Sequence, residues 1–171
     1  MLAKQRRIDR VAALLRVLFS VIWMVDASLK WLPDFRAHYV DLIGDEAKGQ
    51  PAWLIPWFHF WQWLFSLQPT VFAYVLALVE SYIALALFLG FARKVTYILG
   101  IIWTILIWST AEGFGKPDMG PWTDVGTAII YTVVFLALLA FDARFGTGTY
   151  TVDVVLERWI PWWRRIAEVR Q

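Results

Sequence analysis

Cysteine is absent from this 171-residue sequence. Without a thiol the chain can form no disulfide, iron–sulfur cluster or thiolate metal site. Histidine is scarce as well, because the two histidines, His38 and His59, both lie outside the long apolar segments, which excludes a haem held by two histidines inside a membrane. The sequence also has no Gly-rich phosphate loop, nucleophile–base motif or flavin fingerprint. We therefore expect no intrinsic cofactor and no metal site.

Charge is the second thing that the chain has little of. Charged residues make up 18% of it and the formal net charge is only +2, so nothing suggests a nucleic-acid partner. Hydrophobic residues make up 60%, whereas globular domains have about 45–50% apolar and about 25% charged residues. Twelve Trp and twelve Phe contribute to this excess, and aromatic rings collect at membrane–water boundaries. The composition predicts an all-α membrane protein in contact with a lipid bilayer.

Four apolar segments are long enough to cross a bilayer core, which takes roughly 20 helical residues. They cover residues 11–31, 70–91, 95–111 and 125–141. We expect one domain, a four-transmembrane-helix bundle over residues 1–171. The first segment is too long for the apolar part of a signal peptide and contains Arg16 and Asp26, so it is interpreted as an uncleaved span.

The basic residues predict the sidedness of the spans. Twelve Lys and Arg residues fall on the side of the two termini and four on the other side, which places both termini in the cytoplasm by the positive-inside rule. The outer loop, residues 32–69, has a Trp-rich second half broken by Pro51 and Pro56, which predicts one short helix at the outer interface. The tail, residues 142–171, is predicted to form an amphipathic helix on the cytoplasmic leaflet, and Arg16 to reach the inner headgroups.

One carboxylate lies in the middle of a span. Glu80 occurs in "LALVESYIALALF", about halfway along the second span, where an ionised group in hydrocarbon costs several kcal/mol. Glu80 should therefore face the bundle interior, find a partner, or carry a proton. Ala73, Ala77 and Ala84 share its helical face, and such small residues allow another helix to approach closely.

The remaining polar residues of the spans gather toward the outer side. They are Asp26 and Lys30 of the first span, Thr104, Trp108 and Glu112 of the third, and Asp124, Thr127 and Tyr131 of the fourth. Helical spacing puts each of these groups on one face of its helix. The pattern predicts a polar wedge that opens outward and ends at Glu80, and no comparable set enters from the cytoplasmic side.

Each of these residues also has a purely structural interpretation. Asp124 is placed to cap the fourth helix. Glu112 lies at a helix C-terminus, where its charge opposes the helix dipole, so it requires a cation such as Lys30 or Lys116. Asp26 and Lys30, four residues apart, form either an ion pair within the helix or part of a ligand site.

Several segments together resemble the DoxX/DoxD family of small four-helix membrane proteins. They are "SLKWLPDF", "ESYIALALFLGFARK", "EGFGKPDMGPWTDVGTAIIY" and "GTGTYTVDVVLE", the last with Thr151 in place of a Ser and with Asp153 retained. The resemblance implies a multi-pass protein of a prokaryotic plasma membrane that joins other subunits of a redox complex, as in thiosulfate:quinone oxidoreductase.

If this quinone-linked interpretation holds, the headgroup of a quinone lies in the outer wedge. Glu80, Asp26 and Glu112 would then be the catalytic proton-handling groups, because quinone reduction takes up protons. Trp108 and Tyr131 would line the ring, with Lys30 and Asp124 nearby. Two alternatives stay open: an accessory subunit that stabilises its partners without chemistry of its own, and a small transporter, which the few polar residues in the inner half disfavour.

Overall fold

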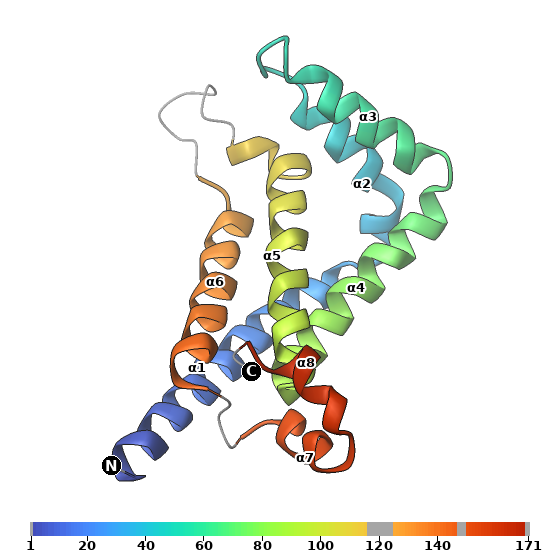
Figure 1. The fold of residues 1–171 in the computed structure, drawn as a ribbon. Helices are drawn as coiled ribbons and strands as arrows, with labels where there is room; N and C mark the ends of the chain where they lie inside the picture. The colour runs from blue at the N-terminus through green and yellow to red at the C-terminus, as the bar shows by residue number, and fades with distance from the viewer. Residues whose placement is uncertain (1, 116–124, 147–149, 170–171) are drawn as a thin grey trace.

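The computed structural model describes residues 2–115, 125–146 and 150–169, and these form helices and turns without any strand (Figure 1). The α-helices are α1 (Leu2–Leu29), α2 (Pro33–Glu46), α3 (Ile55–Ser66), α4 (Pro69–Leu89), α5 (Arg93–Thr110), α6 (Thr127–Phe145), α7 (Val152–Trp159) and α8 (Arg164–Ala167). Two single 3-10 turns, η1 (Gly113–Gly115) and η2 (Pro161–Trp163), complete them. The predicted all-α fold class is confirmed for the part of the chain described.

Three of the described helices are long and apolar enough to cross a membrane. They are the Arg7–Leu29 part of α1, α4 and α6, which match the first, second and fourth predicted spans. Helix α5 covers the third predicted span but is not among the three, since Arg93 and Lys94 occupy its first two positions. One side of α1 exposes large apolar residues, as a surface in contact with lipid would: Val11, Leu14, Leu15, Leu18, Val21, Ile22, Val25 and Leu29.

The long helices pack as two closely associated pairs. Helix α1 lies along α4, and α5 lies along α6 (Figure 1). Gly100 of α5 allows the second pairing, because a Cβ atom there would lie 2.3 Å from the ring of Phe135. The hydroxyls of Thr104 and Thr132 also share a hydrogen bond of 2.8 Å between these helices. Ala77 and Ala84 are buried with Glu80 on α4, as the predicted small-residue face requires.

The connection between α1 and α4 contains two helices, and not the single one predicted. Pro33 opens α2 at the first helical turn, where its missing N–H costs nothing. Helices α2 and α3 pack against each other as a hairpin with a small core of their own, which includes Tyr39 and Phe58. The Tyr39 hydroxyl donates a 2.8 Å hydrogen bond to the carbonyl of Pro69 and so ties α2 to the start of α4. We call this end of the molecule the hairpin end.

The tail differs from its prediction too. In place of one helix lying on a membrane surface, α7 and α8 turn back at Pro161 and pack near the start of α5 (Figure 1). Asp153, fully buried, fixes this contact: its carboxylate accepts the backbone N–H groups of Ala92 and Arg93 at 2.7 and 3.1 Å and the indole N–H of Trp163 at 2.8 Å. We call this the tail end.

A buried charge cluster lies at the tail end, where the sequence predicted no polar set. The Arg93 side chain is 2% exposed and lies 2.9 Å from Asp153 and 3.6 Å from Asp142. Arg16, predicted to reach the headgroups, is instead 6% exposed and donates a 2.8 Å hydrogen bond to the carbonyl of Tyr150. The predictions for Arg16 and for the inner half of the bundle were therefore wrong, because the folded tail covers these charges.

Candidate functional site

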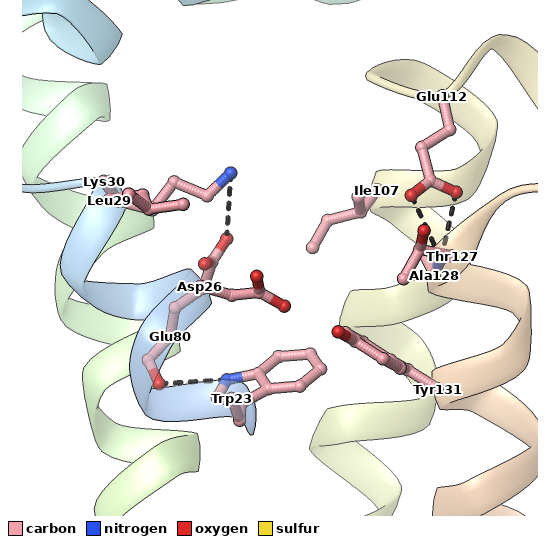
Figure 2. Close-up of a pocket in the computed structure, with 10 residues that line it drawn as sticks. All are labelled: Trp23, Asp26, Leu29, Lys30, Glu80, Ile107, Glu112, Thr127, Ala128 and Tyr131. Carbon is pink, nitrogen blue, oxygen red and sulfur yellow. Dashed lines mark hydrogen bonds and ion pairs between the residues drawn. The ribbon is translucent and has the colours of Figure 1, made fainter. Parts of the chain in front are cut away.

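A polar cavity of about 230 Å³ opens between α1, α4, α5 and α6, toward the hairpin end (Figure 2). Its lining residues are Trp23, Asp26, Leu29, Lys30, Glu80, Ile107, Glu112, Thr127, Ala128 and Tyr131. Five of the seven predicted site residues are among them: Glu80, Asp26, Glu112, Lys30 and Tyr131. Residues that are more than 100 positions apart in the chain thus meet around one space, which we call the polar cavity.

Glu80 lies at the buried side of the polar cavity and is 3% exposed. Its carboxylate lies 4.0 Å from the ammonium of Lys30, at the edge of ion-pair distance. Its backbone carbonyl accepts a 3.1 Å hydrogen bond from the indole of Trp23, which joins α4 to α1 (Figure 2). The acid therefore faces protein and cavity, as predicted for a carboxylate within a span.

Lys30 follows the last residue of α1 and contacts two different environments. Besides the Glu80 carboxylate, its ammonium lies 4.6 Å from the centre of the Phe35 ring in α2, a cation–π distance. Its side chain is 26% exposed, so water reaches it more easily than it reaches Glu80. Lys30 therefore supplies the positive charge at the edge of the cavity.

Asp26 and Tyr131 face each other across the polar cavity. Figure 2 shows the Asp26 carboxylate on α1 and the Tyr131 hydroxyl on α6 pointing toward one another. Both side chains are partly buried. A carboxylate accepts hydrogen bonds and a phenol donates one, so the Tyr131 hydroxyl can donate to Asp26 or to a bound molecule.

Glu112 has a partner that the sequence did not reveal. Its two carboxylate oxygens lie 3.1 and 3.0 Å from the backbone nitrogen of Ala128, in the first turn of α6 (Figure 2). A carboxylate at a helix N-terminus binds a free N–H and is favoured by the helix dipole. The charge of Glu112, which opposes the dipole of α5, is thus stabilised by α6, whereas the prediction assigned this task to a lysine; Lys116 lies outside the described residues.

Gly126 explains how Glu112 can approach so closely. It occupies the N-cap position of α6 with φ of 91°, and a Cβ atom there would lie 2.4 Å from the Glu112 carboxylate. Only glycine accepts this left-handed conformation without strain while leaving room for the acid. Glu112, which follows the C-cap residue of α5, therefore caps α6 at Ala128, whereas Asp124, predicted to cap this helix, lies outside the described residues.

Of the two other predicted residues, only Trp108 lies within the described part of the chain. Trp108 does not line it: the indole donates a 2.8 Å hydrogen bond to the carbonyl of Val125, and its ring packs edge-to-face on Phe114 at 5.1 Å. Trp108 thus fixes the connection that precedes α6, beside Glu112. Asp124 lies outside the described residues.

Trp23 is a lining residue that sequence reasoning missed. It is 2% exposed and forms the lower wall of the polar cavity in Figure 2, together with Tyr131. Trp23, Asp26 and Lys30 are spaced i, i+3 and i+7, so the helical period alone indicated that they share a face. The prediction considered only the polar residues of this face and so omitted Trp23.

Packed aromatic rings close the polar cavity on the side of the tail end. Phe19, Trp23, Tyr131 and Phe135 meet with ring centres 5.0 to 5.9 Å apart, mostly edge-to-face. Phe135 and Trp23 are almost completely buried, and aliphatic residues of the main core continue beyond them toward Tyr97. This aromatic layer separates the carboxylates of the cavity from the buried charges at the tail end.

A second cavity, of about 300 Å³, adjoins the first on the side of the α2–α3 hairpin. Most of its lining is apolar or aromatic: Phe35, Tyr39, Leu42, Ile43, Phe65, Leu76, Trp103, Leu106, Ile107 and Ala111, with Thr110. It shares four lining residues with the polar cavity, namely Lys30, Glu80, Ile107 and Glu112. We call it the apolar cavity.

No group of three or more His, Asp or Glu side chains suited to hold a metal ion occurs within the described ranges. His38 instead lies 3.2 Å from Asp34 on the surface of α2. The chemistry that the site offers is therefore that of carboxylates, an ammonium and a phenol, which bind polar groups and exchange protons.

Comparison with known proteins leaves the family open. No protein-family model, curated protein or solved structure gives a significant match to this chain. The resemblance to the DoxX/DoxD family therefore stays a prediction from the sequence, and the function must be argued from the site.

Proposed function

We propose that the chain is a membrane subunit of a redox complex, DoxX/DoxD-like in its organisation, whose polar cavity binds the headgroup of a quinone. In this proposal α5 is a fourth span, both termini are cytoplasmic and the hairpin end faces outward in a prokaryotic plasma membrane. The observation that carries the proposal is the convergence of three acids, an ammonium and a phenol on one cavity among apolar helices.

The donors and acceptors of the cavity suit a quinone and its reduced form. The Lys30 ammonium and the Tyr131 hydroxyl are donors for a carbonyl oxygen, whereas the carboxylates of Glu80 and Asp26 accept from a hydroxyl. Reduction of a quinone to the quinol takes two electrons and two protons. The acids would supply or receive the protons, and the electrons would come from a partner subunit, since we expect no redox centre in this chain.

Quinone content after purification tests this proposal. The wild-type chain, extracted with native lipid, should retain quinone, and Lys30→Met and Asp26→Asn should each retain clearly less. Asp41→Asn is the matched control, because Asp41 is exposed on α2 and lines neither cavity. Quinone-free wild-type protein in a fully active complex would contradict the proposal, as would equal quinone content in all variants.

A second candidate function is an accessory subunit without chemistry of its own. Two observations favour it: Glu80 already has Lys30 as a partner, and Glu112 serves as the cap of α6. Under this hypothesis Glu80→Gln leaves turnover of the complex unchanged, whereas deletion of the exposed α3 indoles Trp57 and Trp63 releases partner subunits. Loss of turnover in an intact Glu80→Gln complex would exclude it.

The third hypothesis, a transporter, has the least support. Polar side chains do occur in the inner half of the bundle, but the aromatic layer of Phe19, Trp23 and Phe135 lies between them and Glu80. A continuous polar route would have to displace these packed rings. We therefore do not propose transport.

A further inference from the structure

The two cavities differ sharply in chemical character although they adjoin each other. The polar cavity offers carboxylates, an ammonium and a phenol, whereas the apolar cavity offers mainly Leu, Ile, Phe and Trp side chains. Their common boundary is formed by Lys30, Glu80, Ile107 and Glu112. A site with this division fits an amphiphile whose polar ring lies on one side of the boundary and whose hydrocarbon chain lies on the other.

We infer that the apolar cavity receives the hydrocarbon tail of the molecule whose headgroup lies in the polar cavity, so that the ligand class is a long-chain, lipid-soluble quinone. This inference rests on the proposed function and specifies its ligand. The ring would sit among Glu80, Asp26 and Tyr131, and the chain would pass Ile107 toward Leu76 and Leu106 beneath the α2–α3 hairpin.

The boundary residues explain why such a ligand would bind in one orientation. The Lys30 ammonium lies between the Glu80 carboxylate at 4.0 Å and the centre of the Phe35 ring at 4.6 Å. The polar cavity therefore meets the charges of Lys30 and Glu80, and the apolar cavity also meets the aromatic carbon of Phe35. A polar ring on the Glu80 side meets the Glu80 carboxylate and the Lys30 ammonium, and a hydrocarbon chain there would leave both charges unmatched.

The hydrocarbon chain of the ligand contributes to binding through packing contacts, and not through the removal of apolar surface from water. A quinone arrives from the bilayer, whose interior is as apolar as the cavity, so the transfer of its chain gains little hydrophobic free energy. What the cavity adds is a set of close contacts along the chain, each individually small. We therefore expect a moderate preference for long-chain quinones, which a side chain that fills the cavity abolishes.

The experiment compares two probes, tetramethyl-benzoquinone and a benzoquinone with an n-decyl chain, on the full chain in phosphatidylcholine nanodiscs. Leu76→Trp fills the apolar cavity from α4, and Leu78→Trp is its matched control, because Leu78 lies two residues further on the same helix and is 56% exposed. Wild type and Leu78→Trp should prefer the decyl probe. Leu76→Trp should bind the decyl probe at least about fivefold more weakly than the wild type does, which corresponds to the smallest typical free-energy cost of overpacking a cavity. Its affinity for tetramethyl-benzoquinone should be unchanged.

A second pair of variants tests the same inference in case Leu76→Trp fails to fold. Leu106→Phe fills the same cavity from α5, and Ile105→Phe changes its exposed neighbour. The same loss of chain-length preference in Leu106→Phe, but not in Ile105→Phe, supports the inference.

The remaining outcomes separate this inference from the proposed function. If both probes bind equally well in the wild type, or if Leu76→Trp weakens the binding of both probes alike, the binding of the hydrocarbon chain in the apolar cavity is refuted while quinone binding stands. A phospholipid acyl chain found in the cavity in place of the decyl chain would likewise refute it. If neither probe binds the wild type, the proposed function itself fails.

Discussion

The ammonium of Lys30 lies 4.0 Å from the carboxylate of Glu80, and the two side chains differ in their access to water. Lys30 is 26% exposed, whereas the Glu80 side chain is 4% exposed. If the pair is broken, Lys30 can therefore be hydrated where it stands, and Glu80 cannot.

The first prediction follows from this asymmetry. Lys30→Met should lower the free energy of unfolding by about 1–3 kcal/mol, because it leaves a buried acid without its cation. Glu80→Gln should cost less, and the double variant should be more stable than Lys30→Met alone. Thermal denaturation of the four proteins in nanodiscs measures this coupling. Strictly additive effects would show that the two side chains do not interact.

The second prediction concerns the cap that Glu112 provides for α6. Glu112→Ala should destabilise the protein by about 0.5–2 kcal/mol, the usual cost of losing an N-terminal cap. Glu112→Gln should fall between Ala and wild type, because its amide oxygen still accepts a hydrogen bond but the charge that favours the helix dipole is lost. Hydrogen exchange at the Ala128 amide should accelerate in the same order. Unchanged exchange at Ala128 would contradict the capping role.

The third prediction concerns Asp153, which joins the tail to the start of α5. Asp153→Asn removes the negative charge 2.9 Å from the buried Arg93 guanidinium and should cost about 3–5 kcal/mol. We expect α7 and α8 to detach, and trypsin to cleave faster after Arg164 and Arg165. Val155→Asn is the control, because Val155 lies exposed on the same helix. Equal cleavage rates in the two variants would exclude this role for Asp153.

The fourth prediction is a pH dependence of tail docking. Burial is the main cause that raises the pKa of Glu157 in α7, and the nearby Glu168 carboxylate adds to it, while Arg93 and Arg164 act in the opposite direction. The folded state therefore binds this proton more tightly than the unfolded state does, so stability falls as pH rises. The contribution is fully present below the ordinary carboxyl pKa of 4.5 and is lost as pH passes the raised value.

Glu157→Gln should remove this pH dependence and make the docked tail more resistant to trypsin at neutral pH. Proteolysis at a series of pH values, corrected for the pH profile of trypsin with an unfolded substrate, measures the effect. A tail that docks more tightly as pH rises would give the opposite sign and refute the assignment to Glu157.

The fifth prediction tests the number of spans and uses the absence of cysteine. Single cysteines at Asp41 in the hairpin and Val155 in the tail are both at exposed positions. If α5 crosses the membrane with α1, α4 and α6, a membrane-impermeant maleimide added to intact cells labels Asp41→Cys, and Val155→Cys only after permeabilisation. Labelling of both from outside would mean that α5 does not span.

The sequence predicted the composition of the polar cavity better than its detailed contacts. Helical periodicity placed Asp26 and Lys30 on one face, and depth within the spans predicted a wedge that leads from the outer end through Asp26 to Glu80. Periodicity cannot reveal that a carboxylate will bind a backbone N–H of another helix, because a backbone group has no signature in the sequence. For that reason the contact between Glu112 and the Ala128 N–H was not predicted.

The tail end shows a different limit of sequence reasoning. Arg93 and Asp153 are 60 residues apart. In the sequence alone, Arg93 looks like part of a basic turn and Asp153 like an acidic residue at the start of a helix. Only the fold of α7 and α8 onto α5 shows that they are buried together, with Arg16 nearby. Helix α2 was missed for a simpler reason: Pro33 and Asp34 gave a start signal, but its residues are not strongly apolar.

The aromatic layer formed by Phe19, Trp23, Tyr131 and Phe135 closes the polar cavity toward the tail end. A molecule in the cavity therefore cannot continue toward Arg93 and Asp153 without displacing these rings. Entry and departure are left to the other sides of the cavity, one of which adjoins the apolar cavity.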